Sequence, residues 1–405
     1  MATITIPRIA KRTVEDLAVQ GKRVLVRVDY NVPLNDQGTI TDDTRIKETL
    51  PTINYLLEKG ASLILCAHLG RPKGKADPKF SLKPVAKRLE ELLRKPVQMA
   101  PDCVGPEVER MAQGLQPGGI LLLENLRFHA EEEANDPSFA KALAGLADVF
   151  VQDAFGAVHR AHASTSGVAG IIPSAAGLLL AKEIYFLSKA MENPEKPFIA
   201  ILGGAKVSDK IAVIENLLEK VNALVIGGAM AYTFLKAQGI EVGNSRVEAD
   251  KVDLAKALLK KAQEKHIQVF LPLDHIVVET VDPKAPSEVT PDRSIPVGKI
   301  GVDIGPNTIK SLIPLLQKAK TVIWNGPMGI FEMPAFAAGT LGVAKALAEA
   351  TKHGAMTIVG GGDSVAAVKQ AGLADQLSHI STGGGASLEF LEGKALPGIA
   401  VLPNA

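Results

Sequence analysis

Two lysines lie four residues apart in the segment ILGGAKVSDK, residues 201–210, directly after a run that is typical of a buried strand. Glycine lets the backbone approach a ligand and lysine supplies positive charge, so this pattern favours phosphate binding. The spacing differs from the G-x-x-x-x-G-K-[ST] of a P-loop. We expect Lys206 and Lys210 to lie one helical turn apart on a helix that leaves the strand, so that both reach one anionic group.

A second set of cations comes from arginines in the first half of the chain. Three of them follow predicted strands and one opens a helix behind the capping signal TDDT; they are Arg45, Arg71, Arg127 and Arg160. Guanidinium groups from separate loops suit a small, multiply anionic ligand, because each can bind carboxylate or phosphate in a bidentate manner. Asp29 and Asn31 add an acceptor and an amide for hydroxyl groups. Any one of these arginines, taken alone, fits a loop-stabilising ion pair equally well.

Other chemistries find less support in the residue pattern. His68, His159 and His162 share the arginine-bearing loops but lack cysteine or carboxylate partners at ligand spacing, which favours hydrogen bonding over a metal site. No G-x-S-x-G elbow occurs, and no G-x-G-x-x-G follows the first strand, which argues against a serine nucleophile and a nicotinamide dehydrogenase.

Glycine-rich turns recur in the second half, at residues 202–206, 360–364 and 382–386. A helix that begins behind such a turn offers backbone N–H groups and the positive end of its dipole to phosphate. Asp363, inside the second turn, could ligate a Mg²⁺ ion held mainly by nucleotide phosphates. The alternative is that these glycines only form tight connections between elements.

The elements that must position these residues alternate along the chain. Apolar runs typical of strands occur at 24–28, 63–66, 120–123, 149–151, 198–202, 224–226, 269–271, 322–324 and 357–359, with helical patterns such as 45–59 between them. This alternation predicts α/β architecture with doubly wound parallel sheets. Ligands in such sheets bind at the carboxyl ends of the strands, where the polar residues lie.

Length and patterning indicate two Rossmann-like domains. The chain of 405 residues is long for one core, and residues 181–197 resemble a helix that ends in a proline-bounded connector. We place four strands before this hinge helix and five after it. The predicted domains are residues 1–186 together with a returning tail, 390–405, and residues 187–389.

Composition limits the class of protein. The 45 basic and 44 acidic residues nearly balance, so a general affinity for nucleic acid or membrane is not indicated. Two cysteines are too few for a disulfide framework, and the N-terminus, MATITIPRIAKRTVEDL, has no signal-peptide pattern. We expect a cytoplasmic protein.

The motifs together resemble the phosphoglycerate kinase family over essentially the whole chain. The segments RVDYNVP, HLGRPKG, LLENLRFH, DAFGAVHRAHAS, ILGGAKVSDK, WNGPMGIFE, GGGDS and STGGGAS occur in family order. The resemblance implies reversible phosphoryl transfer between 1,3-bisphosphoglycerate and MgADP, giving 3-phosphoglycerate and MgATP, by a monomer that closes about a hinge. Tyr30, Val158 and Ser364 depart from the usual family residues, but none of these changes removes a charged group.

The resemblance also implies roles for individual residues. Phosphoglycerate would be bound by Asp29, Asn31, Arg45, His68, Arg71, Arg127 and Arg160. The nucleotide and the transferring phosphate would be served by Lys206, Lys210, Gly301, Glu332, Gly361, Gly362, Asp363 and Ser364. Within these sets Arg45, Lys206 and Lys210 would be catalytic, and Asp363 would hold Mg²⁺.

Two other classes remain as alternatives. A two-lobed binding protein that clamps a phosphorylated metabolite would explain the arginines, but not the lysine–glycine loops with a candidate Mg²⁺ carboxylate. Another two-domain nucleotide enzyme, such as a ligase or a dehydrogenase, would require a nucleophile or a dinucleotide fingerprint that the sequence lacks.

Overall fold

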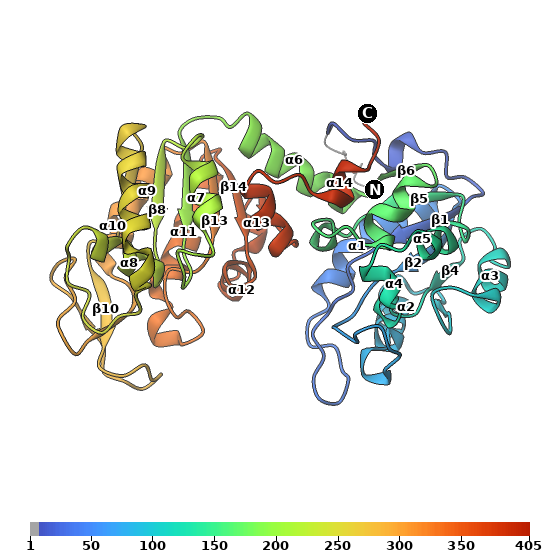
Figure 1. Ribbon diagram of the computed structural model, residues 1–405, viewed down its shortest axis with the longest axis horizontal. Coiled ribbons are helices and arrows are strands. Elements are labelled where there is room, and N and C mark those ends of the chain that lie inside the picture. Colours follow the sequence, from blue (N-terminus) through green and yellow to red (C-terminus); the bar gives the residue numbers. More distant parts are fainter. Residues whose placement is uncertain (1–7) are drawn as a thin grey trace. The chain divides into compact units, whose positions relative to one another are not determined.

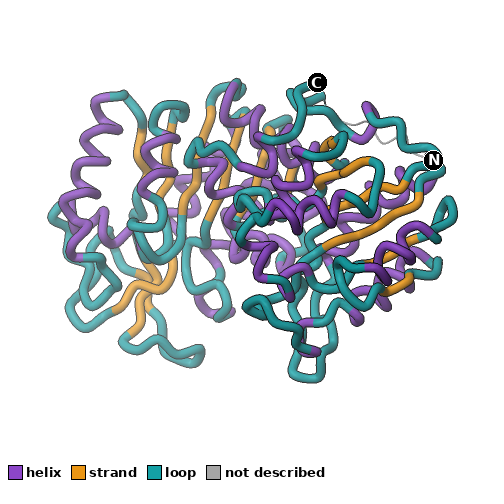
Figure 2. The backbone as a smooth tube through the Cα atoms, turned by 45° about the vertical axis from the view of Figure 1, so that its right-hand side comes forward, coloured by secondary structure: helices purple, strands orange, loops and turns teal. Residues whose placement is uncertain are grey.

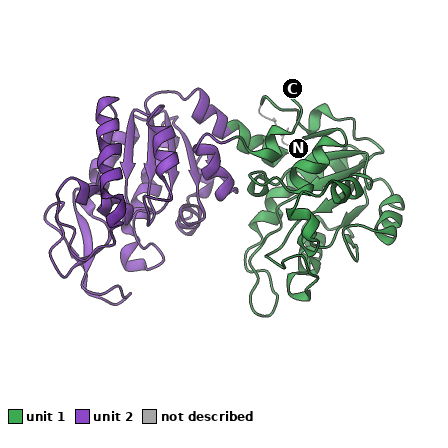
Figure 3. Cartoon of the chain, in the orientation of Figure 1, with its two compact units in different colours: residues 1–185, 395–405 green, residues 186–394 purple. Residues whose placement is uncertain are grey.

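The computed structural model describes residues 8–405 (Figure 1). Residues 1–7, which open the N-terminal segment considered above for a signal peptide, lie outside the described part. The chain divides into two compact units, Met1–Tyr185 with Ala395–Ala405, and Phe186–Lys394 (Figure 3). From the sequence we expect these divisions after residues 186 and 389.

Unit 1 contains a six-stranded parallel sheet in the order β3-β4-β2-β1-β5-β6. Its strands are β1 (Arg23–Arg27), β2 (Ser62–Cys66), β3 (Gln98–Met99), β4 (Ile120–Leu122), β5 (Val149–Gln152) and β6 (Ser174–Ala176). Its helices are α1 (Thr44–Glu58), α2 (Lys83–Leu93), α3 (Pro106–Gln113), α4 (Ala130–Glu133), α5 (Pro137–Ala144) and α14 (Pro397–Ala400).

Unit 2 contains a second six-stranded parallel sheet, in the order β15-β14-β13-β7-β8-β9. The strands are β7 (Phe198–Leu202), β8 (Ala223–Ile226), β9 (Gln268–Phe270), β13 (Thr321–Asn325), β14 (Met356–Gly360) and β15 (His379–Ile380). A small antiparallel sheet, β11-β10-β12, is formed by β10 (His275–Val278), β11 (Glu288–Val289) and β12 (Ile300–Ile304). The helices are α7 (Ile211–Leu217), α8 (Met230–Ala237), α9 (Val252–Glu264), α10 (Pro306–Gln317), α11 (Ala338–Lys352), α12 (Gly362–Gln370) and α13 (Gly385–Leu391).

Burial explains why both large sheets form from aliphatic runs. Every residue of β2, β7 and β13 is buried, as expected for parallel strands with helices on both faces (Figure 2). The doubly wound α/β prediction is therefore confirmed. Among the described residues, no helix has the length and apolar character needed to cross a bilayer.

The predicted count of four strands before the hinge and five after it is wrong. All nine predicted strands exist, but each large sheet has six, and the small sheet adds three more. The missed strands β3, β6 and β15 are two or three residues long, too short to produce an apolar run. The antiparallel sheet was missed because β11 is exposed and β12 carries Gly301 and Asp303 in its interior.

One helix spans the division between the units. Helix α6 (Leu178–Glu192) begins directly behind β6, and the division falls between its residues Tyr185 and Phe186. Asp153, which follows β5, caps its first turn: Oδ1 accepts hydrogen bonds from the backbone N–H groups of Leu179 (3.0 Å) and Leu180 (3.2 Å). The helix is therefore anchored to the carboxyl end of the unit 1 sheet.

The C-terminal segment belongs to unit 1. The N–H of Ala405 donates to the carbonyl of Ala10 (3.0 Å) and the N–H of Arg12 donates to the carbonyl of Pro403 (3.0 Å). These bonds form a short antiparallel pairing with the start of the described chain. The polypeptide thus passes from unit 1 to unit 2 in α6 and returns after Lys394.

Candidate active site

Arg45 lies in the first turn of α1, where the capping signal places it. The Asp42 carboxylate accepts from both the N–H (2.9 Å) and the hydroxyl (2.6 Å) of Thr44, and this fixes the start of the helix. Nη1 of Arg45 donates to Asp29 Oδ1 (3.1 Å) and to the carbonyl of Asn31 (3.0 Å). The loop after β1 therefore holds a half-buried guanidinium in a set orientation.

Gly70 connects the loops that follow three neighbouring strands. Its N–H donates to Asn31 Oδ1 (2.9 Å), and its carbonyl accepts from Arg127 Nη1 (3.1 Å). Gly70 has a φ of +62°, a region that favours glycine. Arg127 is 3% exposed, and its Nε lies 3.6 Å from Glu133 Oε1. The next residue, Arg71, is exposed.

A concentrated positive field surrounds the histidines of this region. Burial first, and then the charges of Arg27, Arg127, Arg160 and His162, hold the pKa of His68 well below its usual range. Burial and the same arginines lower the pKa of His162 to about 4. Arg27, Arg127 and Arg160 share this region with two carboxylates, Glu132 and Glu133, so positive charge is in excess and the region is suited to an anionic ligand.

In unit 2, the cation Lys210 lies beside the carboxyl end of β13. Its Nζ donates to Asn325 Oδ1, at the end of β13. Burial lowers the pKa of Lys210, while Asp209, Glu392 and Asp363 act in the opposite direction and favour the ammonium form. Lys210 is thus a partly desolvated cation, of the kind that interacts strongly with phosphate because few waters compete.

The predicted placement of the two lysines on one helix is wrong. Helix α7 begins only at Ile211, so Lys210 is its N-cap and Lys206 lies in the preceding loop with an exposed side chain. The Glu248 carboxylate accepts from the N–H groups of Val207 (2.6 Å) and Ser208 (3.2 Å) and stabilises this loop. These bonds fix the loop that precedes the helix.

Glycines after β7, β8 and β13 serve mainly to let backbones meet. A Cβ on Gly203 would lie 2.1 Å from the carbonyl oxygen of Pro327, and one on Gly228 would lie 2.6 Å from the nitrogen of Gly204. The N–H of Gly204 donates to that same Pro327 carbonyl (3.0 Å). The glycines of the turn at 202–206 therefore form a tight connection between elements. This agrees with the alternative interpretation of the glycine-rich turns given from the sequence.

The other two glycine turns lead into helices, as the sequence predicted. Gly361, with a φ of +87°, is the N-cap of α12, and Gly384 is the N-cap of α13. Ser364 Oγ in the first turn of α12 accepts from the N–H of Gly326 (2.6 Å) and joins this turn to the end of β13. Asp363, beside it, is exposed.

Comparisons with known proteins place these features in one family. The phosphoglycerate kinase family model matches residues 14–394. The chain belongs to the phosphoglycerate kinase family. It is 60% identical to the phosphoglycerate kinase of Chlorobium phaeobacteroides over 97% of this chain and 99% of that protein. It is 58% identical to the "Phosphoglycerate kinase, cytosolic" of Triticum aestivum over 97% of this chain and 98% of that protein.

Solved structures agree with this assignment. The structure of phosphoglycerate kinase from Coxiella burnetii is 43% identical, with a TM-score of 0.88 over 96% of this chain and 98% of that chain. That from Pyrococcus horikoshii is 34% identical, with a TM-score of 0.80 over the same shares. The resemblance to the phosphoglycerate kinase family drawn from the motifs is confirmed.

The structure brings some of the site residues implied by the family together and leaves others apart. Asp29, Asn31, Arg45 and Arg127 are joined through direct bonds or through Gly70, and Arg160 and His68 share one positive field. In unit 2, Lys210 bonds to Asn325, and Gly361 packs against the same amide. Gly301 lies elsewhere, in the small sheet, where its N–H donates to Ser245 Oγ (2.8 Å). Glu332 is exposed in the loop after β13.

Two residues of the site were not singled out from the sequence. Arg27 is 1% exposed at the end of β1, and its signal was a lone arginine that closes an apolar strand. Asn325 is 2% exposed at the end of β13, and its Nδ2 has no hydrogen-bond partner among the described residues. A buried amide donor beside a lysine suits a phosphate oxygen, so this part of unit 2 fits an anionic nucleotide.

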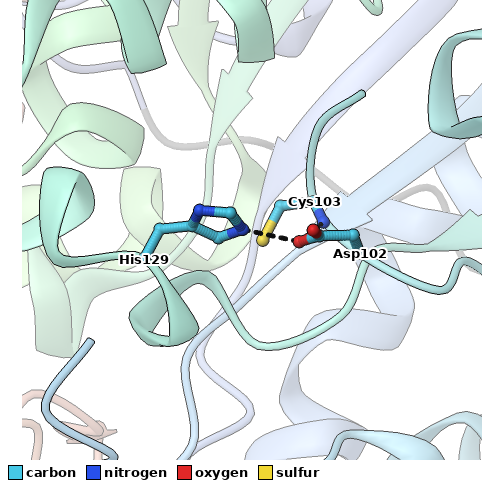
Figure 4. A group of neighbouring side chains, drawn as sticks. All are labelled: Asp102, Cys103 and His129. Carbon is cyan, nitrogen blue, oxygen red and sulfur yellow. Dashed lines mark hydrogen bonds and ion pairs between the residues drawn. The ribbon is translucent and has the colours of Figure 1, made fainter. Parts of the chain in front are cut away.

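One group of potential metal ligands occurs in the described chain, and it lies in unit 1. Asp102, Cys103 and His129 have ligand atoms within 4.8 Å of one another (Figure 4). His129 Nε2 is 2.6 Å from Asp102 Oδ1, while the Cys103 thiol donates to the carbonyl of Glu124 at 3.3 Å. Burial raises the pKa of Cys103 well above its usual range. A carbonyl oxygen at the sulfur favours the thiol over the thiolate that a metal requires, so the group is a hydrogen-bonded cluster.

Proposed function

We propose that the chain is a phosphoglycerate kinase that transfers a phosphoryl group reversibly between 1,3-bisphosphoglycerate and MgADP, giving 3-phosphoglycerate and MgATP. The observation that carries this proposal is the cluster of Arg27, Arg127 and Arg160 around a histidine whose pKa is strongly depressed. Such a field, at the carboxyl ends of the strands of a parallel sheet, favours a small ligand with several negative charges.

Unit 1 binds phosphoglycerate in this proposal. The side chains that would contact it are Asp29, Asn31, Arg45, His68, Arg71, Arg127 and Arg160. Arg45 already bonds to Asp29 and to the backbone of Asn31, so it binds without first losing the freedom of a mobile side chain. The guanidinium groups come from separate loops and can therefore hold phosphate and carboxylate at the same time.

Unit 2 binds the nucleotide. The residues assigned to it are Lys206, Lys210, Gly301, Glu332, Gly361, Gly362, Asp363 and Ser364. Asp363 is the candidate for Mg²⁺, because its carboxylate is exposed in the first turn of α12 and oxygen ligands suit this ion. When bound, Mg²⁺ would neutralise phosphate charge. Asn325 Nδ2 supplies a further donor for a phosphate oxygen.

The chemistry requires positive charge more than proton transfer. The acceptor is a carboxylate or an ADP oxygen that is already ionised, so no general base is needed. The migrating group spreads negative charge over its oxygens, and cations fixed around it lower the barrier without reorganising. Lys206, Lys210 and Arg45 fill this role, and the partial desolvation of Lys210 strengthens its share.

Three finer properties belong to the same proposal. The protein acts as a cytoplasmic monomer, a location consistent with two buried free cysteines and with the relative named cytosolic in wheat. Because the two substrates would be bound by different units, a hinge motion must bring them together and exclude water. Its partners are these small molecules, with no nucleic acid or membrane.

A coupled assay tests the proposal directly. Full-length protein is mixed with 3-phosphoglycerate and MgATP, and the acyl phosphate product is followed through a downstream dehydrogenase that oxidises NADH. A signal that requires both substrates and Mg²⁺ is expected. A folded sample that binds 3-phosphoglycerate yet gives no signal would favour the alternative of a binding protein and reject the kinase.

A further inference from the structure

Four buried residues from four elements of unit 1 form a continuous hydrogen-bonded chain. Arg27 ends β1, His68 follows β2, Glu132 lies in α4, and Ser164 lies in a π-helix, Ala163–Gly167. None of the four is more than 6% exposed. Glu132 and Ser164 have been given no role above, and Arg27 only that of a positive charge, so their arrangement requires an explanation.

The direction of every bond in this chain is fixed by the chemistry of arginine. A guanidinium has only donors, so Arg27 Nε must donate to Ser164 Oγ (2.8 Å). The single hydroxyl proton of Ser164 is then directed to Glu132 Oε2, at 2.5 Å, while Glu132 Oε1 accepts from the N–H of Ser164 (2.7 Å). A buried carboxylate thus orients the serine, and the serine orients the guanidinium.

The other end of Arg27 determines the state of His68. Nη2 of Arg27 lies 2.9 Å from His68 Nδ1, and because Nη2 can only donate, Nδ1 must accept. A neutral imidazole whose Nδ1 accepts carries its proton on Nε2. Burial and the nearby positive charges also oppose a second proton on the ring; these charges are Arg27, Arg127, Arg160 and His162. The carboxylate in the hydrogen-bonded chain, Glu132, is bound to Ser164.

We propose that Arg27, held by Ser164 and Glu132, is a positioning residue that fixes His68 as a neutral Nε2–H donor for an oxygen of phosphoglycerate. The identity of the ligand rests on the proposed function, whereas the tautomer does not. His68 then binds the anion as a hydrogen-bond donor whose strength does not change near neutral pH. His68 then adds no positive charge to the anion site, whose guanidinium groups remain charged.

Nitrogen NMR of the full-length protein tests the tautomer without any substrate. In long-range ¹H–¹⁵N spectra, the His68 ring is assigned as the signals lost in His68→Gln. We expect an unprotonated Nδ1, a protonated Nε2 and no titration between about pH 5.5 and about pH 8, where an unperturbed histidine would titrate. A proton on Nδ1, or an imidazolium that forms near pH 6.5, would overturn the proposal.

A matched pair of serine variants tests the positioning role. Ser164→Ala removes the link between Glu132 and Arg27, so we expect the His68 signals to shift toward a mixture of tautomers. Ser166→Ala lies in the same π-helix, where its hydroxyl donates to the carbonyl of His162 (3.2 Å), and should leave the His68 signals unchanged. Identical His68 spectra in Ser164→Ala and wild type would reject the role of the serine and carboxylate.

Affinity for 3-phosphoglycerate, measured by calorimetry, tests the donor role. His68→Gln places an amide N–H near the position of Nε2 and should retain binding within about threefold, whereas His68→Ala should weaken it about 10- to 100-fold. Wild-type affinity in His68→Ala would overturn the donor role. If wild type itself bound no 3-phosphoglycerate while the spectra gave the expected tautomer, the proposed function would fail and the positioning of His68 would stand.

Discussion

At the scale of single residues, Lys210 illustrates how a cation can be kept both charged and poorly solvated. Burial opposes its charge and lowers its pKa, but Asp209, Glu392 and Asp363 favour the ammonium. Its bond to Asn325 fixes Nζ at the end of β13. A charge held in this way interacts with phosphate more strongly than a mobile, hydrated lysine such as one on an exposed helix face.

We expect Lys210→Ala to lower kcat about 10²- to 10³-fold while changing the KM for 3-phosphoglycerate little, because the lost charge acts on the migrating group. Arg45→Ala, which also removes a contact to phosphoglycerate, should still lower turnover far more than it weakens phosphoglycerate binding. Steady-state kinetics with both substrates varied provide the measurement. Lys256→Ala, on the exposed face of α9, is the control and should behave as wild type. Equal losses in turnover and in phosphoglycerate affinity would mean that Lys210 only binds the ground state.

The sequence was sufficient to choose most candidate residues but not to orient them. Polar side chains after parallel strands gather at one sheet edge, which is why Arg45, Asp29 and Arg127 could be grouped in advance. Arg27 and Asn325 were not chosen as site residues because each is the last residue of a strand, where a polar side chain is equally typical of a solvated strand end. The predicted position of the two lysines on one helix was wrong because the loop between them, which binds Glu248 38 residues beyond Lys210 in the sequence, precedes the helix.

At the scale of elements, the long aliphatic strands were predictable because burial on both faces produces continuous apolar runs. The short edge strands were not, because β3 and β15 have two residues each and owe their existence to a neighbouring strand. Whether such a short segment forms a strand depends on the neighbouring strand as much as on its own residues. A periodicity read along one chain contains no information about such neighbours.

The backbone contact between Gly203 and the Pro327 carbonyl leads to a stability prediction. A Cβ at Gly203 would lie 2.1 Å from that oxygen, so β7 and β13 would have to separate at their carboxyl ends. We expect Gly203→Ala to lower the free energy of unfolding by about 2–4 kcal/mol in chemical denaturation. Gly170→Ala, where nothing lies within 4 Å of the new Cβ, should change it by less than about 1 kcal/mol. Similar values for the two variants would contradict the steric argument.

Asp153 gives the anchoring of α6 a pH dependence. Burial raises the pKa of Asp153 to about 7. The unfolded value is about 3.9, so between about pH 4 and pH 7 the folded protein retains a proton that the unfolded chain loses. Its contribution to stability is therefore greatest at acidic pH and declines as pH rises through that window.

Asp153→Asn isolates this effect, because an amide oxygen still accepts from Leu179 and Leu180 but does not titrate. Relative to wild type, we expect its unfolding free energy to rise by about 1–3 kcal/mol between pH 4 and pH 7, as urea denaturation can measure. Asp253→Asn, at an exposed position of α9, serves as the control. A difference from wild type that is constant with pH would show that Asp153 does not titrate in this range.

At the scale of the whole molecule, the chain crosses between its two units twice, once in α6 and once after Lys394. Each unit has its own six-stranded parallel sheet, and the proposed function assigns one substrate to each unit. If each unit binds one substrate, the phosphoryl group can transfer only when the reacting oxygens come within bonding distance and water is excluded.

We therefore expect small-angle scattering to report a smaller radius of gyration with 3-phosphoglycerate and an MgATP analogue together than without ligands. Either ligand alone should produce less change, because the closed state gains most when opposite clusters both contact the transferring group. Lys210→Ala loses one of those contacts and should compact less at saturating ligand, while Lys256→Ala should compact as wild type does. An unchanged radius with both ligands bound, verified by calorimetry, would contradict hinge closure, and transfer would then require that the two substrates already meet in the free protein.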